Sequence, residues 1–205
     1  GYKMVKSFLE FWPEDIDLYI YSEEKINLGV KSERVKVIDL FEAQPTLKEF
    51  IARARKRPDA HLLQSSLKKG AIRFSYKSFA IVDGGLNLSA DYIIWHDADM
   101  VTHKKVDAHF LDSLISENKY SVYLGRKNTY TETGFLIFNT TLPVNKIFME
   151  NWRNIYITDE IYKLDEWHDC KCYDKLRIDL KTSDHNLSPW GKDYDHVFIN
   201  SVLGE

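Results

Sequence analysis

The chain has 205 residues, the size of one α/β domain, and 44% of them are hydrophobic, which is enough for a sizeable core. A formal net charge of −3 and an isoelectric point near 6.2 exclude general electrostatic attraction to nucleic acid, so we expect no nucleic acid partner. Aromatic residues reach 14%, which suits a packed core and also the flat faces of sugars.

The first segment predicts a helix followed by strands. Apolar residues at helical spacing indicate a helix over Lys3–Trp12, which Pro13 ends. Short apolar runs predict strands at Leu18–Tyr21 and Val35–Leu40. Because a doubly wound sheet normally opens on a strand, we interpret residues 1–205 as a single domain whose first strand is missing, trimmed from a longer chain.

Two further helices are predicted over Leu47–Lys56 and Ala71–Asp83, with a polar, basic connection between them. The second helix carries Arg73 and Lys77 four residues apart, so both lie on one face. They could hold a diphosphate or a sugar hydroxyl, and a solvated basic face explains the same spacing equally well.

The stretch Tyr92–Met100 is the centre of the prediction. Its apolar start reads as a buried strand, and Asp97 and Asp99 follow directly, where the carboxyl end of a strand opens onto a ligand site. Two carboxylates separated by one small residue can converge on Mg²⁺ or Mn²⁺, which prefer oxygen ligands. The alternative is a solvated turn or a helix cap.

The second half of the chain continues the alternation of helices and strands. In Glu132–Asn139, a strand is approached through Glu-Thr-Gly, so Gly134 indicates close approach of a ligand to the backbone. The other elements predicted here are a helix at His109–Ile115, a strand at Ser121–Leu124 and a helix at Asn145–Tyr156.

Cys170 and Cys172 lie one residue apart, a spacing that disfavours a structural disulfide and falls short of a zinc site. Reduced thiols in a reducing compartment are therefore expected. The sequence shows no signal peptide, and no apolar stretch approaches the ~18 residues of a membrane span. We expect a cytoplasmic protein without a membrane segment.

The order of these motifs carries a resemblance. A basic helix, IIWHDAD, ETGFLIFN, EWHD and a SPWG tail together are similar to nucleotide-sugar glycosyltransferases of the GT-A fold, most of all small viral or bacterial enzymes with a DxD motif. The similarity covers nearly the whole chain from Tyr2 onward. It implies an α/β, Rossmann-like domain with a mostly parallel central sheet flanked by helices.

The resemblance also implies a reaction. A hexosyl or deoxyhexosyl group would move from a nucleoside-diphosphate sugar to a hydroxyl of a glycan or glycoprotein acceptor. Mn²⁺ or Mg²⁺ would bridge the donor diphosphate, with Asp99 as its direct ligand. Asp97 would share the metal or hold the ribose or sugar of the donor. His196 is a further candidate metal ligand, with a surface or capping histidine as the alternative.

By the same resemblance, Arg73, Lys77 and Gly134 would face the donor. Asp169 would be the catalytic acid or base of an inverting transfer, with Glu132 and Glu166 in reserve. In a retaining transfer, Asp169 would instead stabilise the cationic sugar or position the acceptor.

The chain departs from the family pattern in lacking the first strand, which carries much of the nucleoside pocket, and a His-Lys-Gly-like tail. Two other classes of function stay open. One is a metal-dependent phosphohydrolase, although such enzymes usually need more acidic ligands. The other is a non-catalytic carbohydrate-binding domain that has kept the GT-A shape.

Overall fold

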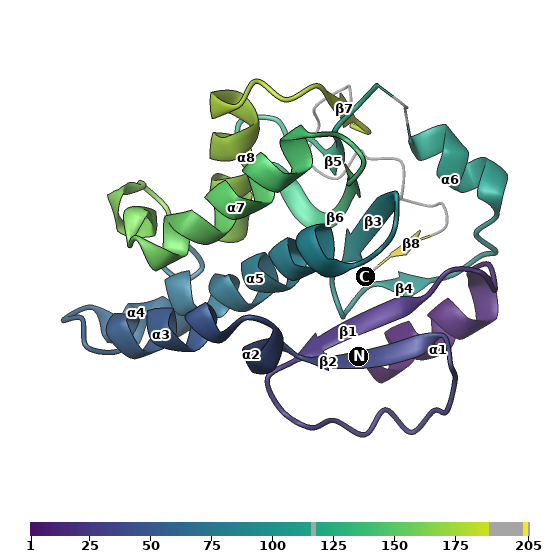
Figure 1. Cartoon of the computed structure of the whole chain (residues 1–205), viewed down its shortest axis with the longest axis horizontal. Helices are drawn as coiled ribbons and strands as arrows, with labels where there is room; N and C mark the ends of the chain where they lie inside the picture. Colours follow the sequence, from purple (N-terminus) through teal and green to yellow (C-terminus); the bar gives the residue numbers. More distant parts are fainter. Residues whose placement is uncertain (116–117, 189–202, 205) are drawn as a thin grey trace.

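The computed structural model describes residues 1–115, 118–188 and 203–204. Its largest sheet has four strands in the order β3–β6–β5–β7, with helices packed on both faces (Figure 1). The bounds of these strands are Tyr92–His96 for β3, Glu132–Asn139 for β6, Ser121–Leu124 for β5 and Asp184–Asn186 for β7. The fold is therefore mixed α/β, as the sequence predicted.

Two smaller sheets accompany it. β1 (Leu18–Ser22) and β2 (Val35–Asp39) form a parallel pair, and β4 (Val101–Thr102) and β8 (Leu203–Gly204) form an antiparallel one. The predicted strands at residues 18–21, 35–40 and 121–124 are confirmed, except that Leu40 opens a helix.

The predicted helices are confirmed, with ends that differ by four residues at most. The helices are α1 (Tyr2–Phe11), α2 (Leu40–Ala43), α3 (Pro45–Ala54), α4 (Ala60–Ser65), α5 (Ala71–Asn87), α6 (Ala108–Leu114), α7 (Val144–Ile157), α8 (Asp169–Asp179) and the 3₁₀ helix η1 (Glu160–Lys163). The short helix α4 lies in what the sequence predicted to be a plain connection. Side-chain caps fix several starts: Asp39 and Asp107 accept hydrogen bonds from the first-turn amides of α2 and α6.

The central sheet is mixed: β3, β5 and β7 run in one direction, and among its described strands β6 alone runs the other way. In the four-stranded sheet, β6 is antiparallel to both β3 and β5, and the β5–β7 pair is parallel. The cause is the connection at residues 125–131, which is too short for the crossover that parallel strands require, so β5 and β6 pair as antiparallel neighbours. Residue patterns alone do not show strand direction.

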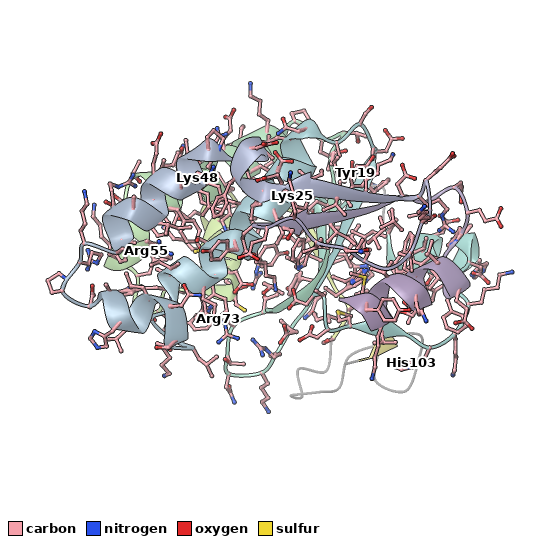
Figure 2. All side chains as sticks on the ribbon, turned by 90° about the horizontal axis from the view of Figure 1, so that it is seen from below. Tyr19, Lys25, Lys48, Arg55, Arg73 and His103 are labelled. Atoms are coloured by element: carbon pink, nitrogen blue, oxygen red, sulfur yellow. The ribbon has the colours of Figure 1, made fainter. Side chains whose placement is uncertain are left out.

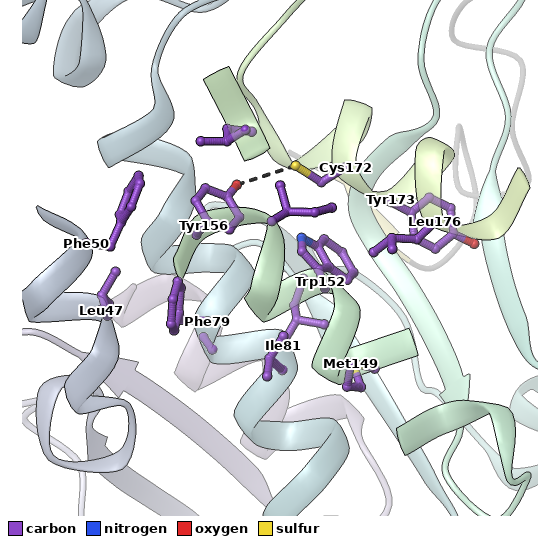
Figure 3. Packing of buried hydrophobic residues seen from close by; sticks show 14 of the residues in the cluster. Leu47, Phe50, Phe79, Ile81, Met149, Trp152, Tyr156, Cys172, Tyr173 and Leu176 are labelled. Atoms are coloured by element: carbon purple, nitrogen blue, oxygen red, sulfur yellow. Dashed lines mark hydrogen bonds between the residues drawn. The ribbon is translucent and has the colours of Figure 1, made fainter. Parts of the chain in front are cut away.

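Alternating side chains give the sheet two apolar faces. On β6, Leu136 and Phe138 face the core beneath α3, α5, α7 and α8, whereas Phe135 and Ile137 face the core beneath α1 and α6. Figure 3 shows the first of these cores, where the Cys172 thiol donates a hydrogen bond to the Tyr156 hydroxyl over 3.8 Å. The sheet is thus buried on both sides.

β1 and β3 are not paired with each other in the described part of the chain, and a cavity of about 520 Å³ lies between them. Whether residues 1–205 are a trimmed domain stays a prediction.

Among the described residues, no helix combines the length and the apolar character needed to cross a membrane.

Candidate functional site

The predicted acidic motif lies at the carboxyl end of β3, where the strand leaves the sheet. The Asp97 amide donates a hydrogen bond to the Gly134 carbonyl over 2.9 Å, which ties the end of β3 to β6. The indole Nε1 of Trp95 donates to Asp97 Oδ1 over 2.8 Å. Backbone and side chain of Asp97 are both held in place.

Lys77 joins this motif to α8. From the middle of α5, its Nζ lies 2.8 Å from Asp97 Oδ1 and 3.0 Å from Asp169 Oδ2. Thr133 completes the group: its hydroxyl donates to Asp169 Oδ2 over 2.5 Å and accepts from Lys77 Nζ over 3.2 Å. The structure therefore brings together residues from α5, β3, β6 and α8 around one ammonium group.

Burial makes this group electrostatically strong. The Asp169 side chain is only 2% exposed and that of Lys77 16%. Burial alone would raise the pKa of Asp169, but the Lys77 ammonium and the Thr133 hydrogen bond outweigh it and lower that pKa below its usual range. Burial alone would lower the pKa of Lys77, but the carboxylates of Asp169 and Asp97 outweigh it and raise that pKa. Both groups are charged at neutral pH.

Gly134 and Glu132 form the β6 side of the site. The Gly134 amide donates to Glu132 Oε1 over 2.9 Å, and a Cβ atom on Gly134 would lie 3.2 Å from the same oxygen. The other Glu132 oxygen pairs with Arg126 Nη1 at 2.9 Å. Glu132 is thus held by two partners at the position that the sequence marked.

Asp99 and Arg73 are not joined to this cluster by any hydrogen bond or ion pair among the described residues. Asp99 is exposed in the turn after β3, without a side-chain hydrogen bond or ion pair in the described part of the chain. Arg73 lies at the surface one turn before Lys77 (Figure 2). Its guanidinium lies over the Phe74 ring. His196 lies outside the described residues.

The start of α8 offers a second donor set for a metal: ligand atoms of His168, Asp169 and Cys170 lie within 4.8 Å of one another. These atoms already have structural partners. His168 Nδ1 accepts from the Lys171 amide at the start of α8, and Asp169 pairs with Lys77. Burial raises the pKa of the Cys170 thiol to about 12, so thiolate ligation is unfavourable. We read this group as the cap of α8.

Sequence reasoning missed Thr133, Trp95 and Arg126. A bulge explains Thr133: Tyr123 pairs with Leu136 but Leu124 with Glu132, so extra residues of β6 leave the regular register. This irregularity breaks the two-residue alternation on which a side-chain prediction would depend. Trp95 was visible as an aromatic residue next to the acidic motif, but nothing in the pattern indicated its hydrogen bond to Asp97.

Comparisons with known proteins give a likeness of fold. No protein-family model and no curated protein matches the sequence. Among solved structures, the chain is similar to mouse xyloside xylosyltransferase 1 in its apo form, with a TM-score of 0.55 and 12% sequence identity. The match covers 91% of this chain and 78% of that one. At this identity, the match shows a fold of the kind found in a glycosyltransferase.

Proposed function

We propose that the chain is a metal-dependent glycosyltransferase that moves a sugar, of the hexosyl or deoxyhexosyl class, from a nucleoside-diphosphate donor to a glycan or glycoprotein hydroxyl. The observation that carries the proposal is the convergence of Lys77, Asp97 and Asp169 at the carboxyl end of β3, in a fold shared with a xylosyltransferase. Ligands of open α/β sheets bind at such strand ends.

Of the two carboxylates in the acidic motif, only that of Asp99 is well suited to bind a hard cation. Asp99 offers exposed oxygens that have no hydrogen-bond or ion-pair partner among the described residues, which suits Mn²⁺ or Mg²⁺. The oxygens of Asp97 are engaged by Lys77 and Trp95, so Asp97 suits the hydroxyls of the donor sugar better than a metal. A bound ion would supply charge neutralisation for the departing nucleoside diphosphate.

Asp169 is better suited to electrostatic stabilisation than to proton transfer. A carboxylate with a lowered pKa is a weak base. The Asp169 carboxylate also already pairs with Lys77 and accepts a hydrogen bond from Thr133. In our proposal Asp169 provides a fixed negative charge near the sugar that becomes cationic as its bond to the diphosphate weakens. Arg126 keeps Glu132 beside Gly134, where it could orient the acceptor hydroxyl.

The phosphohydrolase alternative is disfavoured by Lys77. Its ammonium lies between the carboxylates of Asp97 and Asp169, where a metal shared by those two groups would have to lie. A carbohydrate-binding domain requires no particular arrangement of Lys77, Asp97 and Asp169. An activity measurement is therefore needed to separate this alternative from the transferase.

The test combines binding and turnover. We expect calorimetric titration with a panel of nucleoside diphosphates and nucleotide sugars to show binding that needs Mn²⁺ and is lost with a chelator. We expect slow hydrolysis of the preferred donor, and its loss in an Asp97→Ala, Asp99→Ala double variant. Asp91→Ala, exposed at the other end of β3, is the matched control and should retain activity.

The outcomes separate the classes of function. Turnover that persists in the double variant would refute the metal assignment. Cleavage of simple phosphoesters would favour the phosphohydrolase, and sugar binding without turnover would favour the binding domain. The cytoplasmic location and the identity of the acceptor stay predictions.

A further inference from the structure

The segment from Arg55 to Arg73 concentrates positive charge. It contains six lysines and arginines against one aspartate, a formal charge of +5 in a chain whose net charge is −3. The segment runs from the end of α3 through α4 to the start of α5, and these helices form one end of the molecule (Figure 1). This end is therefore electrostatically distinct from the rest of the protein, which is acidic.

The same segment exposes two leucines. Leu67 is 69% exposed, more than any other large apolar side chain among the described residues, and Leu62 on α4 is 38% exposed. The neighbouring Leu63 is the side chain by which α4 packs in the first core. One exposed leucine on a protein surface is ordinary, but two within the most basic segment indicate a surface that binds something.

Hydrogen bonds hold the backbone around Leu67 in a defined turn. The Ser66 hydroxyl accepts from the amides of Lys68 and Lys69 over 3.2 and 2.9 Å. A Cβ atom on Gly70 would lie only 2.4 Å from the Ser66 carbonyl oxygen, so the turn closes tightly against the glycine. The exposure of Leu67 is therefore a consequence of the local fold.

The two ends of this turn place further residues beside Leu67. The Ser66 amide donates to the Leu62 carbonyl over 3.0 Å, so Leu62 lies one helical turn earlier. On the other side, the Phe74 ring lies 3.0 Å from the position of a Gly70 Cβ atom, and the Arg73 guanidinium lies over that ring. Leucines and cations thus adjoin the same turn.

Acidic neighbours reduce the charge of this end without cancelling it. Arg57 pairs with Asp59 at 2.9 Å, and Arg55 lines a hollow together with Glu23 and Glu24. We therefore count neither arginine toward a surface that binds a partner.

The lysines of the turn have one acidic partner between them. Lys68 pairs with Glu166 at 3.2 Å and still keeps 76% of its side chain exposed. Lys69 donates to the backbone carbonyl of Asp165 over 2.6 Å, whereas the carboxylate of Asp165 pairs with Lys171. The surface around Leu67 remains positive.

We propose that this end of the molecule docks on an anionic lipid surface. The docking patch consists of Leu62, Leu67, Lys68, Lys69 and Arg73. Its leucines enter the headgroup region, and its cations lie beside the lipid phosphates. Elements that lie in a membrane interface combine apolar side chains with lysine and arginine in this way, and each cation near an anionic surface strengthens binding.

A lipid surface accounts for both features of the patch, whereas a soluble polyanion accounts only for its charge. Nucleic acid or a sulfated glycan would gain nothing from an exposed leucine. Single-stranded nucleic acid would also need aromatic rings for its bases. The rings at this end are covered by cations: Lys69 lies over Trp167 at 4.2 Å from the ring centre, and Arg57 lies over Tyr162 at 3.7 Å.

The test measures co-sedimentation of the full chain with lipid vesicles. One set of vesicles is phosphatidylcholine alone, and the other also contains phosphatidylglycerol, whose headgroup is anionic. At about 0.1 M salt we expect at least about tenfold tighter binding to the second set. This binding should weaken at about 1 M salt, where the Debye length falls from about 10 Å to about 3 Å.

Two matched pairs of variants assign the binding to the patch. Lys68→Gln should weaken it about fivefold, whereas Lys146→Gln, on α7 with the same 76% exposure and one glutamate partner, should leave it unchanged. Leu67→Ser should weaken it at least about fivefold, whereas Ile178→Ser, on α8 and 62% exposed, should leave it unchanged. Because all four side chains are exposed, the variants should fold, which circular dichroism checks.

Equal binding to both sets of vesicles, or binding to neither, would overturn the proposal. Equal losses within either pair of variants would also overturn it, because the effect would then not belong to the patch. Binding to heparin that matches binding to the anionic vesicles and is unchanged by Leu67→Ser would assign the patch to a soluble polyanion instead.

The proposal does not depend on the function of the chain, because vesicle binding is measured without sugar donor or metal. Arg73 lies one turn before Lys77 on α5, so docking through the patch would bring the candidate site close to the lipid headgroups.

Discussion

The ammonium group of Lys77 lies between two carboxylates, one of which is almost wholly buried. Taking three charged groups out of water is costly, and the cost is offset only while all of them remain together. Removal of the cation would leave Asp169 with the Thr133 hydroxyl as its main partner. The site residues are therefore also residues on which folding depends.

We predict that Lys77→Met lowers the free energy of unfolding by about 3–5 kcal/mol, the usual cost of leaving a buried partner unpaired. Urea denaturation measures this. Lys36→Met is the matched control: it removes a lysine whose ion pair with Asp17 is exposed to solvent, and it should leave the free energy of unfolding nearly unchanged, because exposed ion pairs contribute little to stability. Equal losses in the two variants would contradict the buried network.

Asp169 gives a prediction about pH. Because its pKa is lower in the folded than in the unfolded chain, its contribution to stability is present above the unfolded pKa and is lost as pH falls through the folded one. The stability difference between wild type and Asp169→Asn should be constant from about pH 6 to 8 and shrink below about pH 4. A difference that stays constant down to about pH 3 would show that Asp169 is not held by Lys77.

At the scale of elements, the close contact of α5 and α7 depends on one glycine. A Cβ atom on Gly85 would lie 2.6 Å from Met149 Cε and 2.9 Å from its Cγ, and Met149 is fully buried. The neighbouring Gly84 has no such contact, because it faces the cavity between β1 and β3. Gly84 and Gly85 are adjacent in one helix, yet only Gly84 has room for a larger side chain.

We predict that Gly85→Ala destabilises the protein by about 1–3 kcal/mol through overpacking. Gly84→Ala should be neutral or stabilising by up to about 1 kcal/mol, because alanine favours the helix. Thermal unfolding compares the two variants. Met149→Ala should offset part of the Gly85→Ala loss, and additive losses in the double variant would argue against this contact as the cause.

Much of this arrangement could be predicted from the sequence, because α5, α7 and β3 are marked by apolar spacing that reports which face is buried. The residues Lys77, Asp97, Gly134 and Asp169 were also marked, yet their contacts were not. Lys77 meets Asp169 only because α5 and α8 pack on the same face of the sheet. Strand direction, the β6 bulge and the partner of Trp95 are set by tertiary packing and have no local signal.

At the scale of the molecule, the four-stranded sheet is buried more completely than the sheet of β1 and β2. Seven of the eight residues of β6 are buried, whereas β1 and β2 are mostly half-buried or exposed. A two-stranded sheet is marginal by itself and depends on its neighbours. Local opening should therefore begin at β1 and β2.

We predict that amides of β1 and β2 in the unmodified chain exchange at least tenfold faster than those of β6. Native-state hydrogen exchange at low denaturant measures the opening free energies separately. The helix α7, which packs in the same core as β6, is the internal reference, and its opening free energy should match that of β6. Equal opening free energies for both sheets would mean that they unfold as one unit.

The indole of Trp95 gives the site an optical reporter. Among the tryptophans in the described residues, Trp12, Trp152 and Trp167 are buried, and Trp95 alone is partly exposed. Its Nε1–H is bound to the carboxylate that Lys77 also holds. A ligand that draws Asp97 away would change the charge beside the excited ring, so the red edge of the intrinsic emission would respond to occupancy of the site. Titration could then be followed in unlabelled protein, at concentrations far below those that calorimetry requires.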